Sequence, residues 1–550
     1  MKNFFAAALA TSLLAGAARI PVHPAVHAAA PSDGQPTATP IKHLVIIYQE
    51  NVSFDHYFAT YPHAKNLPGE PAFFARPGTP SVNGLTGLLL SNNPNASNPI
   101  NGDGATNPFR LDRSQAATAD QDHSYTPEQA AFDFGLMDAF PHSVGAGDPA
   151  RSGHPLATRG LTMGYYDGNT VTALWNYAQR YAMSDNSYGT TFGPSTPGAI
   201  NLISGQTNGI LQDVNSGGAV IDDGNGGLTL ISDPDPLGDK CSGTTGELVQ
   251  FAGKNLGDLL NERGISWGFF EGGFNLGTVN ANKTTGCDRN TRSAVTGVTS
   301  RDYLPHHEPF QYYTSTANPT HTRPTSPFTV GLAGDPANHQ YDLQDFFAAV
   351  SAGNFPSVSY LKAPAYQDGH AGYSDPLDEQ SFLVNTINFL EKRPEWSSTA
   401  VIIAYDDSDG WYDHAFGPIV NQSATAADII RGRPSCGSGA SALPGVNANT
   451  AHAQGRCGYG PRLVLLVVSP YARQNFVDHS LTDQTSILRF VEDNWLDGER
   501  LGGGSFDALA NPLDNMFDFT PSRNAAAPFL LDPQTGLVLR DQPSAFPYGK

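Results

Sequence analysis

Residues 401–414, VIIAYDDSDGWYDH, decide the fold class of this 550-residue chain. Residues 401–405 are an apolar run that is β-branched at its first three positions and leads into a turn containing Gly410. A short apolar run bounded by a turn predicts a strand that is buried on both faces of a sheet. Asp406 and Asp407 follow this strand at its carboxyl end, where open α/β sheets bind their ligands. Because two adjacent carboxylates repel each other, they indicate a divalent cation that neutralises them.

A second strand is predicted over residues 41–48 (IKHLVIIY), and Glu50 and Asn51 follow it directly. Further strands alternate with helices along the chain, including a helix over residues 482–496. This alternation predicts an α/β fold with a mainly parallel sheet. Carboxylate and amide oxygens at the ends of two strands suit a Mg, Ca or Mn ion, and zinc is an alternative.

Composition and charge limit the partners of the chain. The formal net charge is −21, which disfavours binding to nucleic acid or to an anionic membrane surface. The 57 Gly and 42 Pro residues predict long ordered loops rather than a helical bundle. We interpret residues 41–550 as one domain, in which residues 208–330 form a cap or insertion on the main sheet.

The first 28 residues have the features of a secretion signal. Lys2 precedes an apolar stretch over residues 4–17, and small residues dominate 26–30. The stretch is too short to span a bilayer, and no later apolar run reaches about 18 residues. The sequence therefore predicts a cleaved signal peptide, a linker at 29–40, no transmembrane segment, and a periplasmic or extracellular protein.

Export permits disulfides, and the chain has four cysteines, which is an even number. Three pairings are possible, and we favour the nearest-neighbour pairing, Cys241 with Cys287 and Cys436 with Cys457. A metal site made of these cysteines is disfavoured because none of them are spaced as CxxC.

Several motifs occur together and extend over nearly the whole chain after the signal. They are Glu50-Asn51-x-Ser-Phe-Asp-His-Tyr-Phe, DQDH ending at His123, Gly193-Pro194-Ser195-x-Pro197, HEPF beginning at His307, His370, YDDSDGWYDH and a closing SPYA. In type and order they resemble the bacterial phosphoesterase family that contains phospholipases C and the acid phosphatases similar to them.

The resemblance implies an alkaline-phosphatase-like fold, in which a mainly parallel sheet lies between two layers of helices and forms a single catalytic domain. It also implies that Ser195 is a nucleophile held beside a divalent metal ion. The metal ligands that it implies are Glu50, Asn51, Ser195, Asp406 and Asp407.

Three histidines fall on positions that the family uses around the phosphoryl group, namely His123, His307 and His370. They would hydrogen-bond the phosphoryl oxygens or protonate the leaving alkoxide. Asp413 and His414 either support the metal ligands, form a second metal site or have a structural role. Asp185 and His56 are weaker candidates.

Within this family the sequence favours an acid phosphatase over a phospholipase C. The family's phospholipases C typically carry threonine at the nucleophile position, and many have additional C-terminal β domains. This chain has Ser195 and ends about 50 residues after its last predicted helix. We therefore expect a secreted, metal-dependent phosphomonoesterase that acts on small phosphate esters at acid pH. The alternatives are a phospholipase C that cleaves phospholipid head groups and a non-catalytic binding protein on the same fold.

The residues around Ser195 disfavour two other classes of hydrolase. A serine hydrolase of the α/β type needs Gly-x-Ser-x-Gly, and Pro197 occupies the position of the second glycine. A sulfatase carries Cys or Ser followed by x-Pro-x-Arg, and Ala199 occupies the position of the arginine.

Overall fold

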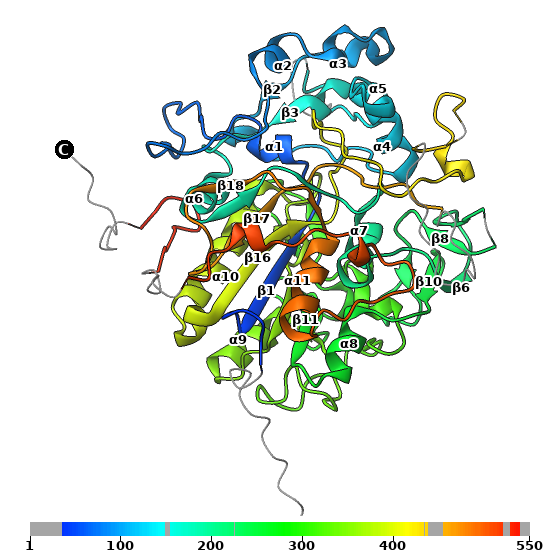
Figure 1. Cartoon of the computed structure of the whole chain (residues 1–550), viewed down its shortest axis with the longest axis vertical. Helices are drawn as coiled ribbons and strands as arrows, with labels where there is room; N and C mark the ends of the chain where they lie inside the picture. Colours follow the sequence, from blue (N-terminus) through cyan, green and yellow to red (C-terminus); the bar gives the residue numbers. More distant parts are fainter. Residues whose placement is uncertain are drawn as a thin grey trace, which may run out of the picture.

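The computed structural model of the chain describes residues 36–148, 155–224, 226–433, 435–437, 455–520 and 528–539. The predicted signal peptide lies outside these residues, and so does most of the predicted linker. Within the described part, no helix has the length and apolar character needed to cross a bilayer. Figure 1 shows helices arranged around a central twisted sheet.

The core is an eight-stranded sheet with the strand order β14-β11-β15-β1-β16-β17-β4-β18. β1 (His43–Gln49) pairs in parallel with both β15 (Val358–Lys362) and β16 (Thr399–Tyr405). The other strands are β4 (Ala182–Ser184), β11 (Trp267–Glu271), β14 (Gln340–Asp342), β17 (Leu465–Val468) and β18 (Phe476–Asp478). β17 runs antiparallel to β16 and β4, and the other pairs in this sheet are parallel. The prediction of an α/β fold with a mainly parallel sheet is confirmed.

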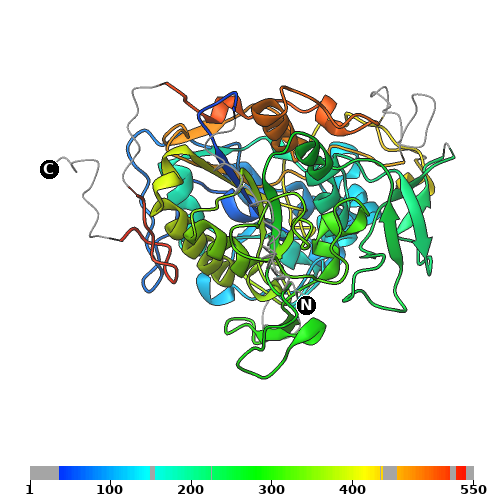
Figure 2. The same cartoon turned by 90° about the horizontal axis from the view of Figure 1, so that it is seen from below.

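Helices cover both faces of the sheet, which gives three layers (Figures 1 and 2). One layer contains α6 (Thr172–Arg180), α9 (Leu343–Ser351) and α10 (Pro376–Glu391). The other contains α7 (Ser195–Ser204), α8 (Leu256–Glu262) and α11 (Thr485–Trp495). Because both faces are covered, every residue of β1 and β16 is buried, as expected for strands without polar alternation.

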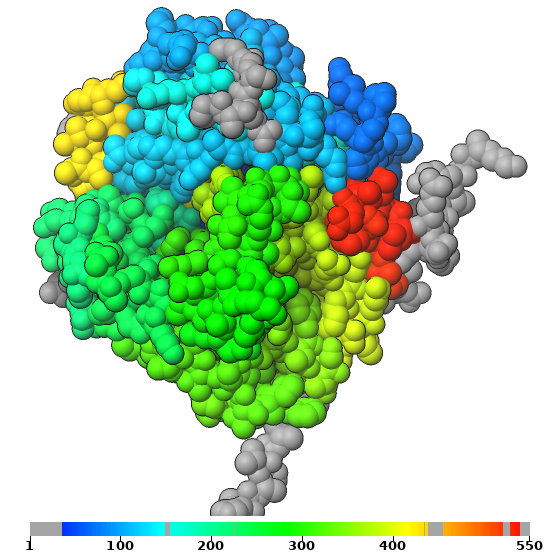
Figure 3. All heavy atoms as spheres, turned by 180° about the vertical axis from the view of Figure 1, so that it is seen from behind, coloured from blue at the N-terminus to red at the C-terminus, as the bar shows by residue number. Residues whose placement is uncertain are grey.

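A further layer lies over the carboxyl ends of the central strands. It is formed by the segment between β1 and α6, drawn in blue to cyan at the top of Figures 1 and 3. Its helices include α1 (Phe54–Phe58), α4 (Tyr125–Phe132) and α5 (Phe140–Ser143). α4 begins two residues after His123, so this layer places one of the predicted histidines near the carboxyl ends of the central strands.

Residues 208–330 contain peripheral strands as well as a strand of the core. β6 (Ile210–Val214), β9 (Asp235–Pro236) and β10 (Leu248–Phe251) form a separate three-stranded sheet. β11, in contrast, belongs to the eight-stranded sheet. Residues 208–330 therefore form a peripheral sheet and also contribute one strand to the core sheet.

The two disulfides are Cys241–Cys287 and Cys436–Cys457, which confirms the nearest-neighbour pairing. Disulfides form and persist in oxidising compartments and are rare in the cytosol. Their presence indicates export of the chain.

One helix begins later than the sequence predicts. α11 begins at Thr485 because Thr482 and Asp483 form the short strand β19, which pairs in parallel with β5 (Ser187–Tyr188). The Asp483 carboxylate accepts hydrogen bonds from Thr485 N (3.1 Å) and Thr190 Oγ1 (2.8 Å). Contacts with a segment about 300 residues away in the sequence thus set the start of the helix, and local sequence does not encode them.

Candidate active site

The carboxyl ends of β1 and β16 meet because of the register in which the two strands pair. Gln49 lies opposite Tyr405, so the residues that follow them, Glu50 and Asp406, come together. The backbone N–H of Asn51 donates a hydrogen bond to Asp406 Oδ1 (2.9 Å) across a sequence separation of 355 residues. The pairing therefore joins the two acidic motifs that the sequence places at strand ends.

Ser195 is the first residue of α7, and its hydroxyl group points at these strand ends. Ser195 Oγ lies 3.0 Å from Glu50 Oε2, 3.3 Å from Asn51 Oδ1 and 3.2 Å from Asp407 Oδ2. A hydroxyl group has one proton and donates it to only one of these oxygens. The first backbone N–H groups of a helix also favour a phosphate group placed at its N-terminus. Ser195 therefore lies in an acidic, oxygen-rich site at the N-terminus of α7, where the next backbone N–H, that of Thr196, donates to Asp233 Oδ1 (2.7 Å).

A close approach between α7 and the end of β16 fixes the position of Ser195. A Cβ atom added at Gly198 would lie only 2.3 Å from the backbone oxygen of Asp406. Any side chain at this position would push α7 away from the strand end. The glycine thus allows the nucleophile helix to reach the acidic turn.

Glu128 of α4 ties the turn before Ser195 to the turn after Asp407. Its Oε2 accepts a hydrogen bond from Gly193 N (2.9 Å), and its Oε1 accepts one from Ser408 Oγ (2.6 Å). Burial raises the pKa of Glu128 to about 8, and the Asp407 carboxylate adds to the effect. One carboxyl group therefore holds two functional turns together.

Lys362, at the end of β15, places an ammonium group among the carboxylates. Its Nζ makes a short ion pair with Glu50 Oε1 and lies 3.6 Å from Asp406 Oδ2, an oxygen that accepts no hydrogen bond. Glu50, Asp406 and Asp407 carry three negative charges when ionised, and Lys362 supplies one positive charge. These carboxylates outnumber the ammonium group, and a divalent cation would neutralise the excess negative charge.

The side-chain amide of Asn51 can be placed in two orientations, which exchange its nitrogen and oxygen and therefore need different partners. In one, its nitrogen donates to Glu50 Oε2 (2.6 Å) and Asp406 Oδ1 (3.1 Å), and its oxygen accepts from His370 Nε2 (3.1 Å). In the other, its oxygen faces those carboxylates and Ser195 Oγ (3.3 Å). The second orientation is favourable only when a cation lies between the oxygens, and it presents the ligand set that hard divalent ions prefer.

The carboxylates of the site differ in their affinity for protons. Burial and the Glu50 carboxylate raise the pKa of Asp406 well above its usual range and that of Asp407 to about 7. Burial acts on Glu50 in the same direction, but His307 and Lys362 outweigh it and hold the pKa of Glu50 well below its usual range. A cation bound at these oxygens would therefore compete with protons for Asp406 and Asp407.

The three predicted histidines surround this cluster. His307 Nε2 lies 3.5 Å from Glu50 Oε1, and His123 Nε2 lies 3.3 Å from Asn51 Nδ2. His370 Nε2 approaches the same amide to 3.1 Å. All eight residues that the family resemblance selects are thus brought together, and their roles remain predictions.

The histidines have different environments. Burial lowers the pKa of His307 well below its usual value and also lowers that of His370. Burial opposes a charge on His123 as well, but Asp407 and Asp409 outweigh it and raise the pKa of His123 well above its usual value. His123 is the one among them that favours the protonated form.

The weaker candidates lie elsewhere. Asp413 and His414 belong to a cluster with Asp55, in which the Arg462 guanidinium pairs with both carboxylates. His56 is buried against the Trp411 ring, with a centroid separation of 3.9 Å. These contacts support a structural role for His56 and for the Arg462 cluster.

Asp185 also lies outside the cluster. Its carboxylate accepts hydrogen bonds from Asn83 N (2.6 Å) and contacts His479 Nδ1 (2.8 Å). Neither of these two contacts involves a residue of the Ser195 cluster.

Sequence reasoning missed Lys362, Glu128 and Asp409. Lys362 is the last residue of β15, and Asp409 lies in the turn after β16. A position at or just after a strand end is the one local signal for these two residues. Glu128 has the pattern of an ordinary helical acid, and only its distant partners reveal its role.

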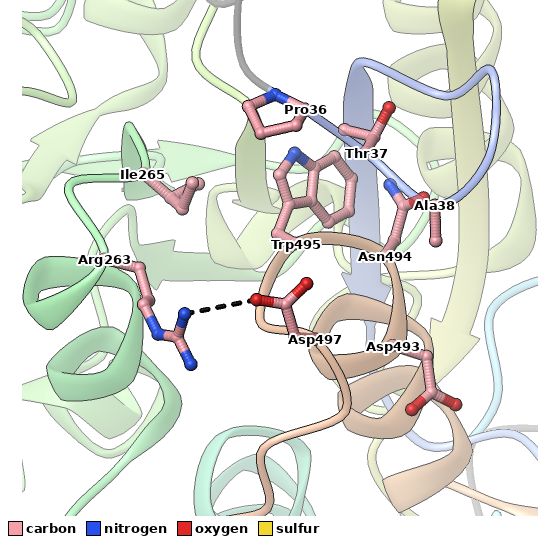
Figure 4. A pocket seen from close by; sticks show the side chains of 9 residues that line it. All are labelled: Pro36, Thr37, Ala38, Arg263, Ile265, Asp493, Asn494, Trp495 and Asp497. Atoms are coloured by element: carbon pink, nitrogen blue, oxygen red, sulfur yellow. Dashed lines mark hydrogen bonds and ion pairs between the residues drawn. The ribbon is translucent and has the colours of Figure 1, made fainter.

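A cavity of about 230 Å³ lies at the opposite end of the sheet, near the start of β1 (Figure 4). It is lined by Pro36, Thr37, Ala38, Arg263, Ile265, Asp493, Asn494, Trp495 and Asp497. Asn494 Nδ2 donates to Ile41 O (3.1 Å), whereas the Ser195 cluster follows the other end of that strand. This cavity is separate from the acidic site.

Comparison with known proteins agrees with the geometry. A family model described as "Phosphoesterase family" matches residues 41–496. The chain is 24% identical over 497 residues to the non-hemolytic phospholipase C of Pseudomonas aeruginosa, covering 90% of this chain and 59% of that protein. It is 24% identical over 528 residues to phospholipase C A of Mycobacterium tuberculosis, covering 94% of this chain and 84% of that protein. The chain thus spans somewhat less than two thirds of the Pseudomonas protein and most of the mycobacterial one.

Proposed function

This chain belongs to the phosphoesterase family, and we propose that it is a phosphoric ester hydrolase that cleaves phospholipids as a phospholipase C does, with Ser195 as its nucleophile. One observation carries the assignment of the nucleophile. The Ser195 hydroxyl, at the start of α7, lies within 3.3 Å of oxygens from Glu50, Asn51 and Asp407. The names of the relatives support phosphodiester substrates, including phospholipids.

The reaction consists of two displacements at phosphorus. Ser195 Oγ gives its proton to a neighbouring carboxylate and attacks the phosphorus atom, the bond from phosphorus to the diacylglycerol oxygen breaks, and the leaving alkoxide takes a proton from a histidine. Water then gives a proton to that histidine and attacks the serine-bound phosphodiester, the bond between phosphorus and Ser195 Oγ breaks, and Ser195 Oγ takes its proton back from the carboxylate. The phosphorylated head group leaves, and the serine hydroxyl is restored.

The ligand set of Glu50, Asn51, Ser195, Asp406 and Asp407 would hold a divalent cation. When bound, such an ion would lower the pKa of the serine hydroxyl and neutralise charge on the phosphoryl group. His307 and Lys362 hold the pKa of Glu50 well below its usual range, so this ligand stays ionised.

The second candidate function is an acid phosphatase that acts on phosphomonoesters. Ser195 itself favours it, because the phospholipases C of the family typically carry threonine at that position. Both candidates use the same nucleophile, so the difference lies in the substrate that the surrounding residues accept.

The test compares hydrolysis of phosphatidylcholine, p-nitrophenyl phosphorylcholine and p-nitrophenyl phosphate over a range of pH, with and without a chelator. We expect a higher kcat/KM for the diesters and loss of turnover on chelation. A preference for the monoester at acid pH would replace the phospholipase C assignment by the acid phosphatase. Failure of the metal-supplemented protein to hydrolyse any of the three would contradict both.

Ser195→Ala should lower kcat by about a thousand-fold or more on every substrate. Ser204→Ala is a matched control in the same helix, because the buried Ser204 hydroxyl hydrogen-bonds the backbone oxygens of Ile200 and Gln206 and the Tyr313 side chain rather than the residues around Ser195. It should leave kcat unchanged. Equal turnover by the two variants would exclude Ser195 as the nucleophile.

A further inference from the structure

Three large apolar side chains are exposed on segments that also carry active-site residues. Leu136 is 63% exposed, Ile429 is 54% exposed and Phe416 is 39% exposed. Leu136 follows α4, the helix of Glu128, and Phe416 lies in the segment that continues from the turn at Asp406. Exposed apolar residues scattered singly are ordinary on a protein surface, whereas several together mark a contact surface.

The turn after α4 holds Leu136 outward in a fixed conformation. Asp133, Phe134 and Met137 all have positive φ, at 42°, 57° and 53°. Such backbone conformations are unfavourable for residues other than glycine and persist only where the surroundings hold them. Here Leu136 N donates to Asp133 O (3.2 Å), and Met137 N donates to Phe132 O (3.0 Å). The exposure of Leu136 is therefore a feature of an ordered turn.

The chain after β16 packs on this turn and adds the rest of the surface. A Cβ atom added at Gly135 would lie 3.3 Å from Phe416 Cδ1, so the Phe416 ring lies against the turn. Arg431 forms a short ion pair with Asp133. The Arg433 guanidinium lies over the aromatic ring that precedes Gly135, at 4.0 Å from its centroid. We use the name rim patch for the exposed side chains that these contacts gather, namely Leu136, Phe416, Ile429, Arg431 and Arg433.

The rim patch and the active site are built on the same helix. Tyr125 OH donates to Asp428 Oδ1 (2.8 Å), and Thr126 Oγ1 donates to Ala427 O (2.8 Å), which binds the segment before Ile429 to the start of α4. Figures 1 and 3 show this segment, drawn in yellow, at the edge of the blue-to-cyan layer. That layer covers the carboxyl ends of the central strands, where Ser195 lies.

The charges of the rim patch suit phosphate groups. The formal net charge of the chain is −21, yet both charged side chains of the patch are arginines. The acids next to them are turned inward: Asp428 is fully buried, Asp133 is 6% exposed and pairs with Arg431, and Asp138 is half-buried beside Asp133. Guanidinium groups bind phosphate oxygens in pairs, and Arg433 offers such a fork among apolar side chains.

We propose that the rim patch binds the surface of a phospholipid bilayer. The apolar side chains would enter the boundary between head groups and acyl chains, and the guanidinium groups would bind lipid phosphates. The choice of a bilayer as the partner rests on the proposed phospholipase activity, because a phospholipase C meets its substrate in a membrane. The patch would hold the protein on the bilayer during successive turnovers.

Sedimentation with sucrose-loaded phosphatidylcholine vesicles tests the proposal. The full chain carries Ser195→Ala in this experiment, so that the lipid stays intact. We expect this parent protein to sediment with the vesicles. The added pair of substitutions Leu136→Glu and Ile429→Glu should lower its partition coefficient about ten-fold or more, because charged side chains replace two inserting ones. Arg433→Gln, which leaves the apolar side chains in place, should also weaken binding.

Phe328→Glu is the matched control at the opposite end of the sheet. Phe328 is 66% exposed, and Gly331, three residues later, accepts a hydrogen bond at its carbonyl oxygen from the backbone N–H of Trp267 (3.1 Å), the first residue of β11. This variant should sediment as the parent does. A parent that stays in the supernatant, equal sedimentation of the parent and the doubly substituted protein, or an equal loss in Phe328→Glu would each overturn the proposal.

Activity separates failure of the patch from failure of the proposed function. In the chain with Ser195 intact, the pair Leu136→Glu and Ile429→Glu should slow hydrolysis of vesicle phosphatidylcholine. It should leave turnover of soluble p-nitrophenyl phosphorylcholine unchanged, which also shows that the variant is folded. A wild type that cleaves neither substrate contradicts the phospholipase assignment, whereas sedimentation still decides whether the rim patch binds a bilayer. Equal losses on the vesicle and the soluble substrate would contradict a role in membrane binding.

Discussion

At the scale of single residues, Lys362 explains how three buried carboxylates persist at one end of the sheet. Its ammonium group contacts Glu50 and Asp406, and all three side chains are almost fully shielded from water. Glu50 and Asp406 raise the pKa of Lys362 well above its usual value against the opposing effect of burial, so the lysine stays charged. The ammonium group and the proposed cation would thus both neutralise negative charge on the same carboxylate oxygens.

Lys362→Met tests this role through stability. The substitution removes a positive charge from a buried network, and breaking such a pair costs about 3–5 kcal/mol of the free energy of unfolding. Added Mn²⁺ or Mg²⁺ should recover part of the loss, because a cation supplies the missing charge. Urea unfolding with and without metal measures both effects.

Lys254→Met is the matched control, since Lys254 forms an exposed ion pair with Glu262. We expect no measurable change in the free energy of unfolding there. A Lys362→Met protein as stable as the wild type in the presence of chelator would contradict the role given to Lys362.

At the scale of secondary-structure elements, the contact between α7 and the end of β16 sets the position of the nucleophile. Gly198 lies against the Asp406 backbone, where a Cβ atom would approach the carbonyl oxygen to 2.3 Å. Since Ser195 lies one turn before Gly198, any displacement of the helix moves the hydroxyl group away from Glu50 and Asp407. Displacements of about 1 Å at a reacting group are costly for catalysis.

Gly198→Ala should therefore lower kcat by about a hundred-fold while the protein remains folded. Ala199→Gly is the control in the same helix, since it costs about 1 kcal/mol of helix stability without adding an atom near Asp406. Steady-state kinetics with circular dichroism compare the two variants. Wild-type kcat in Gly198→Ala would show that the close approach does not position Ser195.

The same elements show how far the sequence determines the site. Apolar runs that end in Glu50 and Asp406 predict two strands and their acidic ends, because each signal lies within about ten residues of sequence. Lys362 could not be predicted in this way. Its strand has a serine at Ser359, and its partner Glu50 lies 312 residues away. Glu128 was missed for the same reason, since both of its partners are distant in the chain.

The fold class follows from the pattern of elements, but the order of the strands does not. The sequence predicts the runs that form β1 and β16, whereas their adjacency depends on tertiary packing. The antiparallel direction of β17 and the late start of α11 also depend on contacts with distant segments. Domain boundaries and the roles of the site residues therefore remain predictions that experiments must test.

At the scale of the whole molecule, buried carboxyl groups make stability depend on pH. Burial raises the pKa of Glu379 to about 8, although hydrogen bonds from Tyr405 and Tyr57 partly oppose it. Burial likewise raises the pKa of Glu391 to about 7 and that of Asp483 to about 6. These groups are protonated in the folded chain over a pH range in which the unfolded chain is ionised.

The sign of the effect follows from proton binding. Between about pH 4.5 and pH 8 the folded state holds a proton on Glu379 that the unfolded state has lost, so stability falls as pH rises. The contribution is complete below the unfolded pKa and is lost as pH rises through the folded pKa. Each such group changes the free energy of unfolding by about 1.4 kcal/mol per pH unit.

Urea unfolding at several pH values, with chelator present throughout, measures this dependence. We expect the wild type to be more stable near pH 5 than near pH 8. Glu379→Gln should reduce the slope, because glutamine stays neutral and still accepts a hydrogen bond from one of the two tyrosines. A stability that rises with pH over this range, or an unchanged slope in the variant, would contradict the assignment.

The most direct test of the central claim is to trap the covalent intermediate on Ser195. The metal-supplemented protein is mixed with its fastest-cleaved substrate, quenched with acid within one turnover, digested and analysed by mass spectrometry. We predict a phosphoryl adduct on the peptide that contains Ser195, absent after chelation and absent in Ser195→Ala. Rapid turnover without any adduct, together with full activity of Ser195→Ala, would contradict the account.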